Sequence, residues 1–104
     1  MKQVTAILLG AGHRGAIIYG QYALSHPDEL KFVAVAEPCD DRRQAFASAH
    51  HIPEEYATVS WEELLEKNIE ADCVFVCTHD RAHYEPTMLA LDKGYHTFTR
   101  SYVV

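Results

Sequence analysis

The sequence has 104 residues, of which 48% are hydrophobic and 23% charged, a balance that predicts one globular domain rather than a disordered or fibrous chain. Fifteen acidic and nine basic residues give a formal net charge of −6, and without a basic run nucleic-acid binding is disfavoured. No apolar stretch approaches the roughly 18 residues that a membrane span needs. Cys39, Cys73 and Cys77 form no CxxC pair, which argues against a disulfide scaffold or a zinc site and is typical of the reducing cytoplasm.

The first predicted strand and helix flank a glycine-rich motif. Residues 4–9 form an almost continuous apolar run, typical of a strand covered on both faces, and residues 14–25 have helical spacing. Between them, Gly10 permits a tight turn, Gly12 leaves room for a pyrophosphate, and Gly15 lets the helix pack closely on the sheet. Backbone N–H groups at the helix start then face the phosphates. The motif predicts dinucleotide binding, with a plain glycine-rich turn as the alternative.

The second predicted strand, residues 32–36, ends in an acid. Glu37 stands where a carboxylate accepts hydrogen bonds from both hydroxyls of an adenosine ribose and repels a 2′-phosphate, which favours NAD over NADP. An ordinary exposed loop glutamate is the alternative. Arg42 is a candidate for stacking on adenine or for accommodating a 2′-phosphate, which keeps NADP open. Arg43 is assigned to a solvated helix face.

The next predicted helix begins near Asp40, a candidate N-cap. Its inner face is expected to hold Ala45, Phe46 and Ala49. A short strand or extended segment over residues 56–59, expected at a sheet edge, follows.

The second half of the chain repeats this alternation. A capping box at Ser60–Glu63 opens a short helix, and residues 72–77 form a strongly predicted strand. A helix over 83–93 with Gly94 as its stop and a last strand over 96–99 complete the series. The side chains of that helix expected to point inward are Met88, Leu89 and Leu91.

Alternating strands and helices predict βαβ units with right-handed crossovers, and therefore a single-domain α/β protein with a doubly wound parallel sheet in three layers, a Rossmann fold. The ligand crevice of such a sheet lies at the carboxyl ends of its strands. Thr78 and His79 are therefore expected beside the nicotinamide, and His83 is expected either to orient that loop or to contact the ligand. His79 and His83 also have the spacing of a metal pair, but only His96 is available as a third ligand, so no metal site is predicted.

These motifs resemble the N-terminal half of the Gfo/Idh/MocA oxidoreductases, named for glucose–fructose oxidoreductase, inositol dehydrogenase and rhizopine catabolism. The resemblance spans residues 3–98 and rests on AILLGAGHRG, the acid and proline after the second strand, the arginine-rich helix, and a threonine followed five residues later by a histidine. It implies an NAD(P)-dependent oxidoreductase of sugars, polyols or their derivatives, with a C-terminal substrate domain that often drives oligomer formation. Matched by position, the residues that resemble the pyrophosphate loop are Gly10, Gly12, His13, Arg14 and Gly15; Glu37 resembles the ribose-binding acid, and Thr78, His79 and His83 resemble the loop beside the nicotinamide.

The sequence departs from this pattern after the last strand. The family usually carries Glu-Lys-Pro there, with the lysine near the nicotinamide and the substrate, whereas this chain has Arg100-Ser101-Tyr102. We therefore expect residues 1–104 to be a dinucleotide-binding domain without the family's substrate domain or catalytic residues, inactive alone, cytoplasmic and homo-oligomeric, and bound to NAD. A non-catalytic NAD-binding or interaction module and an S-adenosylmethionine methyltransferase are the alternatives.

Overall fold

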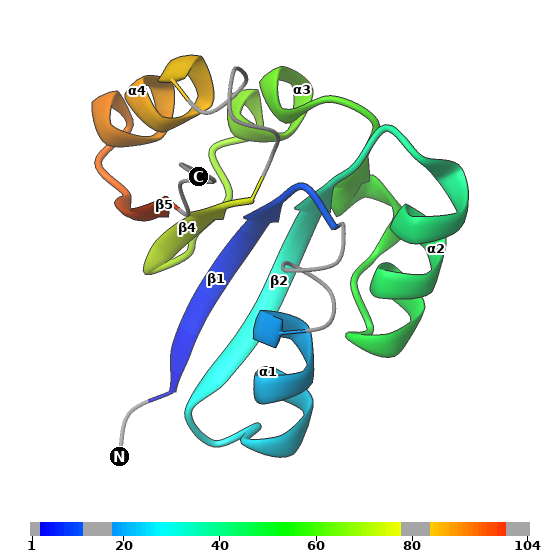
Figure 1. The fold of residues 1–104 in the computed structure, drawn as a ribbon. Coiled ribbons are helices and arrows are strands. Elements are labelled where there is room, and N and C mark those ends of the chain that lie inside the picture. Colours follow the sequence, from blue (N-terminus) through cyan, green and yellow to red (C-terminus); the bar gives the residue numbers. More distant parts are fainter. Residues whose placement is uncertain (1–2, 12–17, 78–83, 100–104) are drawn as a thin grey trace, which may run out of the picture.

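The computed structural model describes residues 3–11, 18–77 and 84–99 (Figure 1). These residues form a five-stranded parallel sheet in the order β3-β2-β1-β4-β5. The strands are β1 (Val4–Leu9), β2 (Leu30–Ala36), β3 (Ala57–Thr58), β4 (Cys73–Val76) and β5 (His96–Thr99). The helices are α1 (Gln21–Ser25), α2 (Asp40–Ala49), a 3-10 turn η2 (Glu54–Tyr56), α3 (Trp61–Glu66) and α4 (Tyr84–Asp92). The predicted Rossmann-like α/β fold is confirmed.

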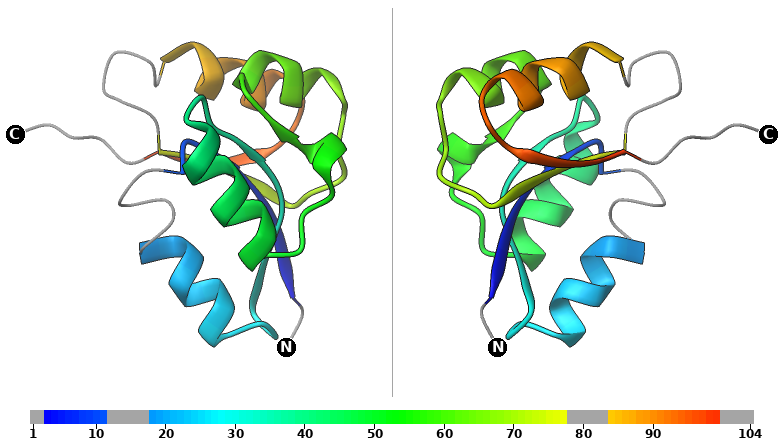
Figure 2. Two further views of the ribbon diagram at one scale, coloured as in Figure 1. Left: turned by 90° about the vertical axis from the view of Figure 1, so that its right-hand side faces the viewer. Right: turned by 90° about the vertical axis from the view of Figure 1, so that its left-hand side faces the viewer.

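The central strands are apolar because helices cover both faces of the sheet. Ala6 and Leu8 of β1 pack in the core beneath α1 and α2, whereas Ile7 and Leu9 pack in the core beneath α3 and α4. Figure 2 shows these helix pairs on opposite sides of the sheet. The four β1 side chains are fully buried, so the continuous apolar run at 4–9 is the pattern expected of a strand with two cores.

A β-bulge interrupts the pairing of β2 with β1. Ala6 pairs with Phe32, but Ile7 pairs with Ala34, so Val33 is an extra residue on β2. Phe32 packs in the core of α1 and α2, whereas Val33 and Ala34 both pack toward α3 and α4. Beyond the bulge, the two strands stay paired up to their carboxyl ends.

The inward face of α2 differs from the predicted one. Phe46 is buried as expected, but Ala45 and Ala49 are exposed. The helix instead turns His50 inward at its C-terminal end, where the imidazole stacks on the Phe46 ring at a centroid distance of 4.1 Å. Burial, and to a lesser extent His51, lower the pKa of His50.

The predicted inward face of α4 is wrong for Met88 and Leu91 and correct for Leu89. Met88 is 43% and Leu91 49% exposed, while Pro86 and Ala90 are buried and Leu89 is partly buried. The helix ends as predicted, because Gly94 has a φ of +90°, in the left-handed region that glycine adopts without strain. At α3, Ser60 Oγ accepts a hydrogen bond from the Glu63 N–H at 3.2 Å, the first bond of the predicted capping box.

Candidate functional site

The carboxyl end of β1 leads into a turn at Gly10. This glycine has a φ of +95°, and its N–H donates to the carbonyl of Ala36 at 2.8 Å. The turn is therefore held against the last residue of β2, in a backbone conformation that disfavours any residue with a Cβ. Ala11, the next residue, is buried.

Glu37 follows β2 directly, and its carboxylate links the turn after β1 to the turn after β2. Its Oε1 accepts a hydrogen bond from the Ala11 N–H at 2.7 Å, and its Oε2 accepts one from the Cys39 N–H at 2.9 Å. Its own N–H donates to the Thr58 carbonyl at 2.9 Å, which ties the residue to the end of β3. The residue is only 6% exposed, so the alternative of an ordinary exposed loop glutamate is wrong. Two charge-assisted bonds offset the cost of burying the carboxylate, and each oxygen retains capacity to accept another bond.

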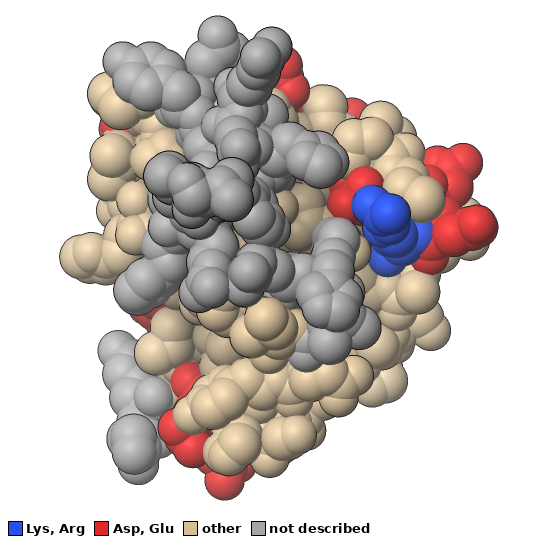
Figure 3. All heavy atoms as spheres, in the orientation of Figure 1, with Lys and Arg blue, Asp and Glu red and all other residues tan. Residues whose placement is uncertain are grey.

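Arg43 packs against this turn instead of lying on a solvated face. Its Nη1 donates to the Glu37 carbonyl at 2.8 Å, and its Nη2 lies 2.5 Å from Asp40 Oδ1. The arginine side chain is 14% exposed, so its assignment to a solvated face is wrong. Asp40 is not the N-cap either, because Cys39 occupies that position and its carbonyl accepts from the Arg43 N–H. Over α2, Figure 3 shows basic side chains beside acidic ones.

The end of β4 lies next to the end of β1. Leu9 pairs with Val76, and the Cys77 N–H donates to the Leu9 carbonyl at 2.8 Å. The crossovers from β1 and β4 pass over opposite faces of the sheet, so the strand order reverses between these two strands. Such a switch point is where α/β sheets bind their ligands.

Seven of the predicted site residues lie outside the described residues: Gly12, His13, Arg14, Gly15, Thr78, His79 and His83. The described residues that directly precede them, residues 10–11 and Cys77, lie at the switch point. Arg42, the remaining predicted residue, is exposed in the first turn of α2. The packing of Arg43 beside Glu37 was not predicted, although its spacing of three from Asp40 is a helical ion-pair spacing.

Two of the three cysteines are buried. Cys73 and Cys77 are 2% and 7% exposed and belong to the same core. Burial, together with the nearby Asp72 carboxylate, raises the pKa of the Cys73 thiol to about 11. A thiol with that pKa is a poor nucleophile at neutral pH. Within residues 3–11, 18–77 and 84–99, no group of three or more His, Cys, Asp or Glu side chains is arranged to hold a metal ion.

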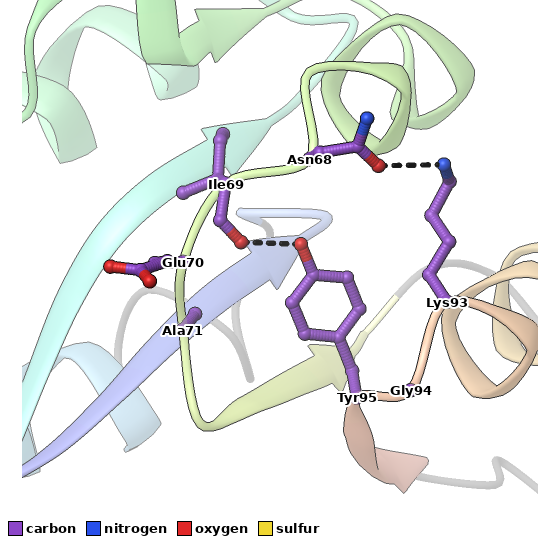
Figure 4. A pocket seen from close by; sticks show the side chains of 7 residues that line it. All are labelled: Asn68, Ile69, Glu70, Ala71, Lys93, Gly94 and Tyr95. Carbon is purple, nitrogen blue, oxygen red and sulfur yellow. Dashed lines mark hydrogen bonds between the residues drawn. The ribbon is translucent and has the colours of Figure 1, made fainter.

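A separate hollow of about 260 Å³ lies at the opposite, amino ends of β4 and β5 (Figure 4). Tyr95 donates its hydroxyl hydrogen bond to the Ile69 carbonyl at 2.5 Å, and Lys93 Nζ lies 3.0 Å from Asn68 Oδ1. Burial raises the pKa of Tyr95. These contacts join the segment before β4 to the segment before β5. We therefore assign the residues that line this hollow a structural role.

Replacement of Tyr95 by phenylalanine is expected to lower the free energy of unfolding by about 1 kcal/mol, because the Ile69 carbonyl loses its donor. Dinucleotide affinity should not change, since the bond lies at the far end of the sheet. Urea unfolding measures the free energy of unfolding, and calorimetry measures the dinucleotide affinity. Tyr22→Phe is the matched control, because it removes an exposed hydroxyl that donates to Glu29 and should cost less than about 0.5 kcal/mol. A Tyr95 variant as stable as wild type would contradict this assignment.

Comparisons with known proteins agree with this geometry. The Gfo/Idh/MocA family model, described as an oxidoreductase family with an NAD-binding Rossmann fold, matches residues 4–99. D-glucoside 3-dehydrogenase of Escherichia coli is 33% identical over 92 residues, which cover 86% of this chain and 24% of that protein. The chain therefore spans about a quarter of the length of this curated relative. No described helix is long and apolar enough to cross a membrane.

Two solved structures illustrate the similarity of fold. The WlbA dehydrogenase of Bordetella pertussis, in complex with NADH and UDP-GlcNAcA, has a TM-score of 0.76 at 20% identity, over 95% of this chain and 29% of that one. A 3-ketoreductase of Actinomadura kijaniata, in complex with TDP-benzene and NADP, has a TM-score of 0.77 at 19% identity, over 94% of this chain and 30% of that one. Together, the family match over residues 4–99 and the curated relative show that this chain belongs to the Gfo/Idh/MocA oxidoreductase family.

Proposed function

We propose that this chain binds NAD in preference to NADP, as the cofactor-binding domain of an oxidoreductase that acts on sugars, polyols or their derivatives. The observation that carries the proposal is the Glu37 carboxylate, which is buried at the end of β2 and linked to the turn after β1. Its remaining lone pairs suit the two hydroxyls of an adenosine ribose. A 2′-phosphate beside the same carboxylate would bring two negative charges together.

The pyrophosphate is assigned to the glycine motif that continues from Gly10. Gly12 and Gly15 keep the backbone clear, and His13 and Arg14 lie between them in the sequence. The Ala11–Glu37 hydrogen bond supports this assignment, because it fixes the start of the motif relative to the ribose-binding acid. Ribose and pyrophosphate groups are therefore expected to bind to one connected piece of backbone.

The nicotinamide is assigned to the segment after β4, where Thr78, His79 and His83 follow Cys77 in the sequence. When bound, the nicotinamide accepts or donates a hydride. The protein's part is to hold the ring at the switch point between β1 and β4. Arg42 is assigned to the adenine side, from the first turn of α2.

The substrate class in this proposal comes from the relatives. The curated relative is named for a D-glucoside, and a solved neighbour is a myo-inositol dehydrogenase of Corynebacterium glutamicum. Hydride transfer also requires a bound substrate and a positioned general base. Ser101 stands where the family usually has its lysine, so we expect these 104 residues to bind the cofactor without turning over a sugar or polyol. We also propose that the enzyme is cytoplasmic and homo-oligomeric.

Calorimetric titration of the chain with NAD, NADP and S-adenosylmethionine tests the proposal. NAD is expected to bind at least about tenfold more tightly than NADP, which corresponds to about 1.4 kcal/mol, and S-adenosylmethionine should give no heat of binding. Equal or tighter binding of NADP would contradict the assignment of Glu37. Incubation of the purified chain with NAD and a panel of polyols should leave the ultraviolet absorbance of reduced nicotinamide unchanged. Robust turnover would show that the chain contains a catalytic group not assigned here.

A further inference from the structure

An ion pair lies beside the proposed ribose-binding acid. Arg43 reaches back from α2 to the Glu37 carbonyl with Nη1 and to Asp40 Oδ1 with Nη2. The aspartate side chain is 73% exposed and the arginine side chain 14%, so the arginine is packed into the turn while its partner faces solvent. Both terminal nitrogens of the guanidinium are therefore engaged within one turn of the chain.

A guanidinium at this position has a second potential partner. Rossmann enzymes that use NADP place an arginine near the end of the second strand to accommodate the 2′-phosphate. The planar fork of the guanidinium matches phosphate oxygens as well as it matches a carboxylate. Arg43 already contacts the backbone of Glu37, the residue assigned to the ribose hydroxyls, so its charge lies beside the proposed ribose site.

We propose that Asp40 is a specificity-determining residue, which favours NAD by holding Arg43 on the Glu37 carbonyl and away from the ribose 2′ position. The inference rests on the proposed function and deepens it. Glu37 disfavours NADP by repulsion, whereas Asp40 disfavours it by occupying a cation that would otherwise bind the 2′-phosphate. Asp40 acts only through Arg43 and needs no contact with the cofactor.

Asp41 provides the matched control for the charge of Asp40. It is the next residue, it is also exposed, and it also lies in the first turn of α2. The ion pair of Arg43 is formed with Asp40. Asp40→Asn and Asp41→Asn therefore remove the same charge from the same helix end, but only Asp40→Asn removes the ion pair of Arg43.

The experiment measures the affinities for NAD and NADP of four proteins by calorimetry: wild type, Asp40→Asn, Asp41→Asn and the double variant Asp40→Asn/Arg43→Ala. The preference for NAD over NADP is expected to fall about tenfold in Asp40→Asn and by less than about twofold in Asp41→Asn. The double variant should return to within about twofold of wild type, because it lacks the released cation. Each preference is a ratio taken on one sample, so a loss of folded protein affects both affinities equally.

Three outcomes would overturn the inference. Equal effects of Asp40→Asn and Asp41→Asn would show a general charge effect. A preference still lowered in the double variant would show that Arg43 is not the cation that binds the phosphate. In both cases wild type still binds NAD and the proposed function stands. Binding of neither dinucleotide by folded wild type would overturn the proposed function and this inference together.

Discussion

Glu37→Ala is expected to weaken NAD binding by at least about a hundredfold. Each ribose hydroxyl that donates to the ionised carboxylate contributes about 1.5–3 kcal/mol, and two such bonds reach that factor. The substitution also removes the acceptor that the Ala11 and Cys39 N–H groups share. Because Ala11 is buried, its N–H would be left without a partner at a cost of about 1–3 kcal/mol in the free energy of unfolding.

Two further variants separate these effects. Glu37→Gln keeps one carbonyl oxygen, but its amide would place a donor opposite one of the two N–H groups, so it should also lose affinity. Glu55→Ala removes an exposed glutamate from η2 and should leave both affinity and stability unchanged. Calorimetry with NAD and urea unfolding give the two readouts. NAD affinity that survives in folded Glu37→Ala would exclude this residue from the cofactor site.

The second large effect is expected at the turn after β1. Gly10→Val puts a β-branched side chain at a φ of +95°, which costs about 1–3 kcal/mol in backbone strain. Relief of that strain would move the backbone that donates to Ala36 and, one residue on, to Glu37. We therefore expect both a lower free energy of unfolding and a loss of NAD affinity of at least about tenfold.

Gly94→Val is the control for this prediction. Gly94 has nearly the same φ, +90°, and an added Cβ would meet nothing within 4 Å. The control therefore carries similar backbone strain at a position between α4 and β5, at the other end of the sheet. It should lose stability while retaining NAD affinity. If both variants lose affinity to the same extent, the loss at Gly10 reflects destabilisation rather than a local change in the site.

The strands could be predicted from the sequence because β1, β2 and β4 are buried on both faces, which leaves apolar runs bounded by glycine, glutamate or polar residues. The inward faces of the helices could not be predicted in the same way. In α4, residues 88–91 are all apolar, so the pattern does not determine which side faces the sheet. In α2, Ala45 and Ala49 are small enough to suit core or surface alike.

The candidate site, too, could be predicted from the sequence only in part. The position of Glu37 follows from the end of an apolar strand, which the sequence shows directly. Its bond to the Ala11 N–H depends on how closely two turns, separated by the whole of α1 and β2, approach each other. The inward orientation of Arg43 depends on a backbone carbonyl, a group that every residue carries and that no side-chain pattern identifies.

The bulge in β2 allows the domain some variation in length. Val33 is the one residue of this strand without its own partner in β1. A chain that lacked Val33 would still pair Phe32 with Ala6 and Ala34 with Ile7, and each side chain would face the core that it faces now. A deletion between Ala34 and Glu37 would instead shift the carboxylate out of register with the turn after β1. A deletion of one residue can therefore be absorbed at the bulge, and it would leave the pairing at the carboxyl end of the sheet unchanged.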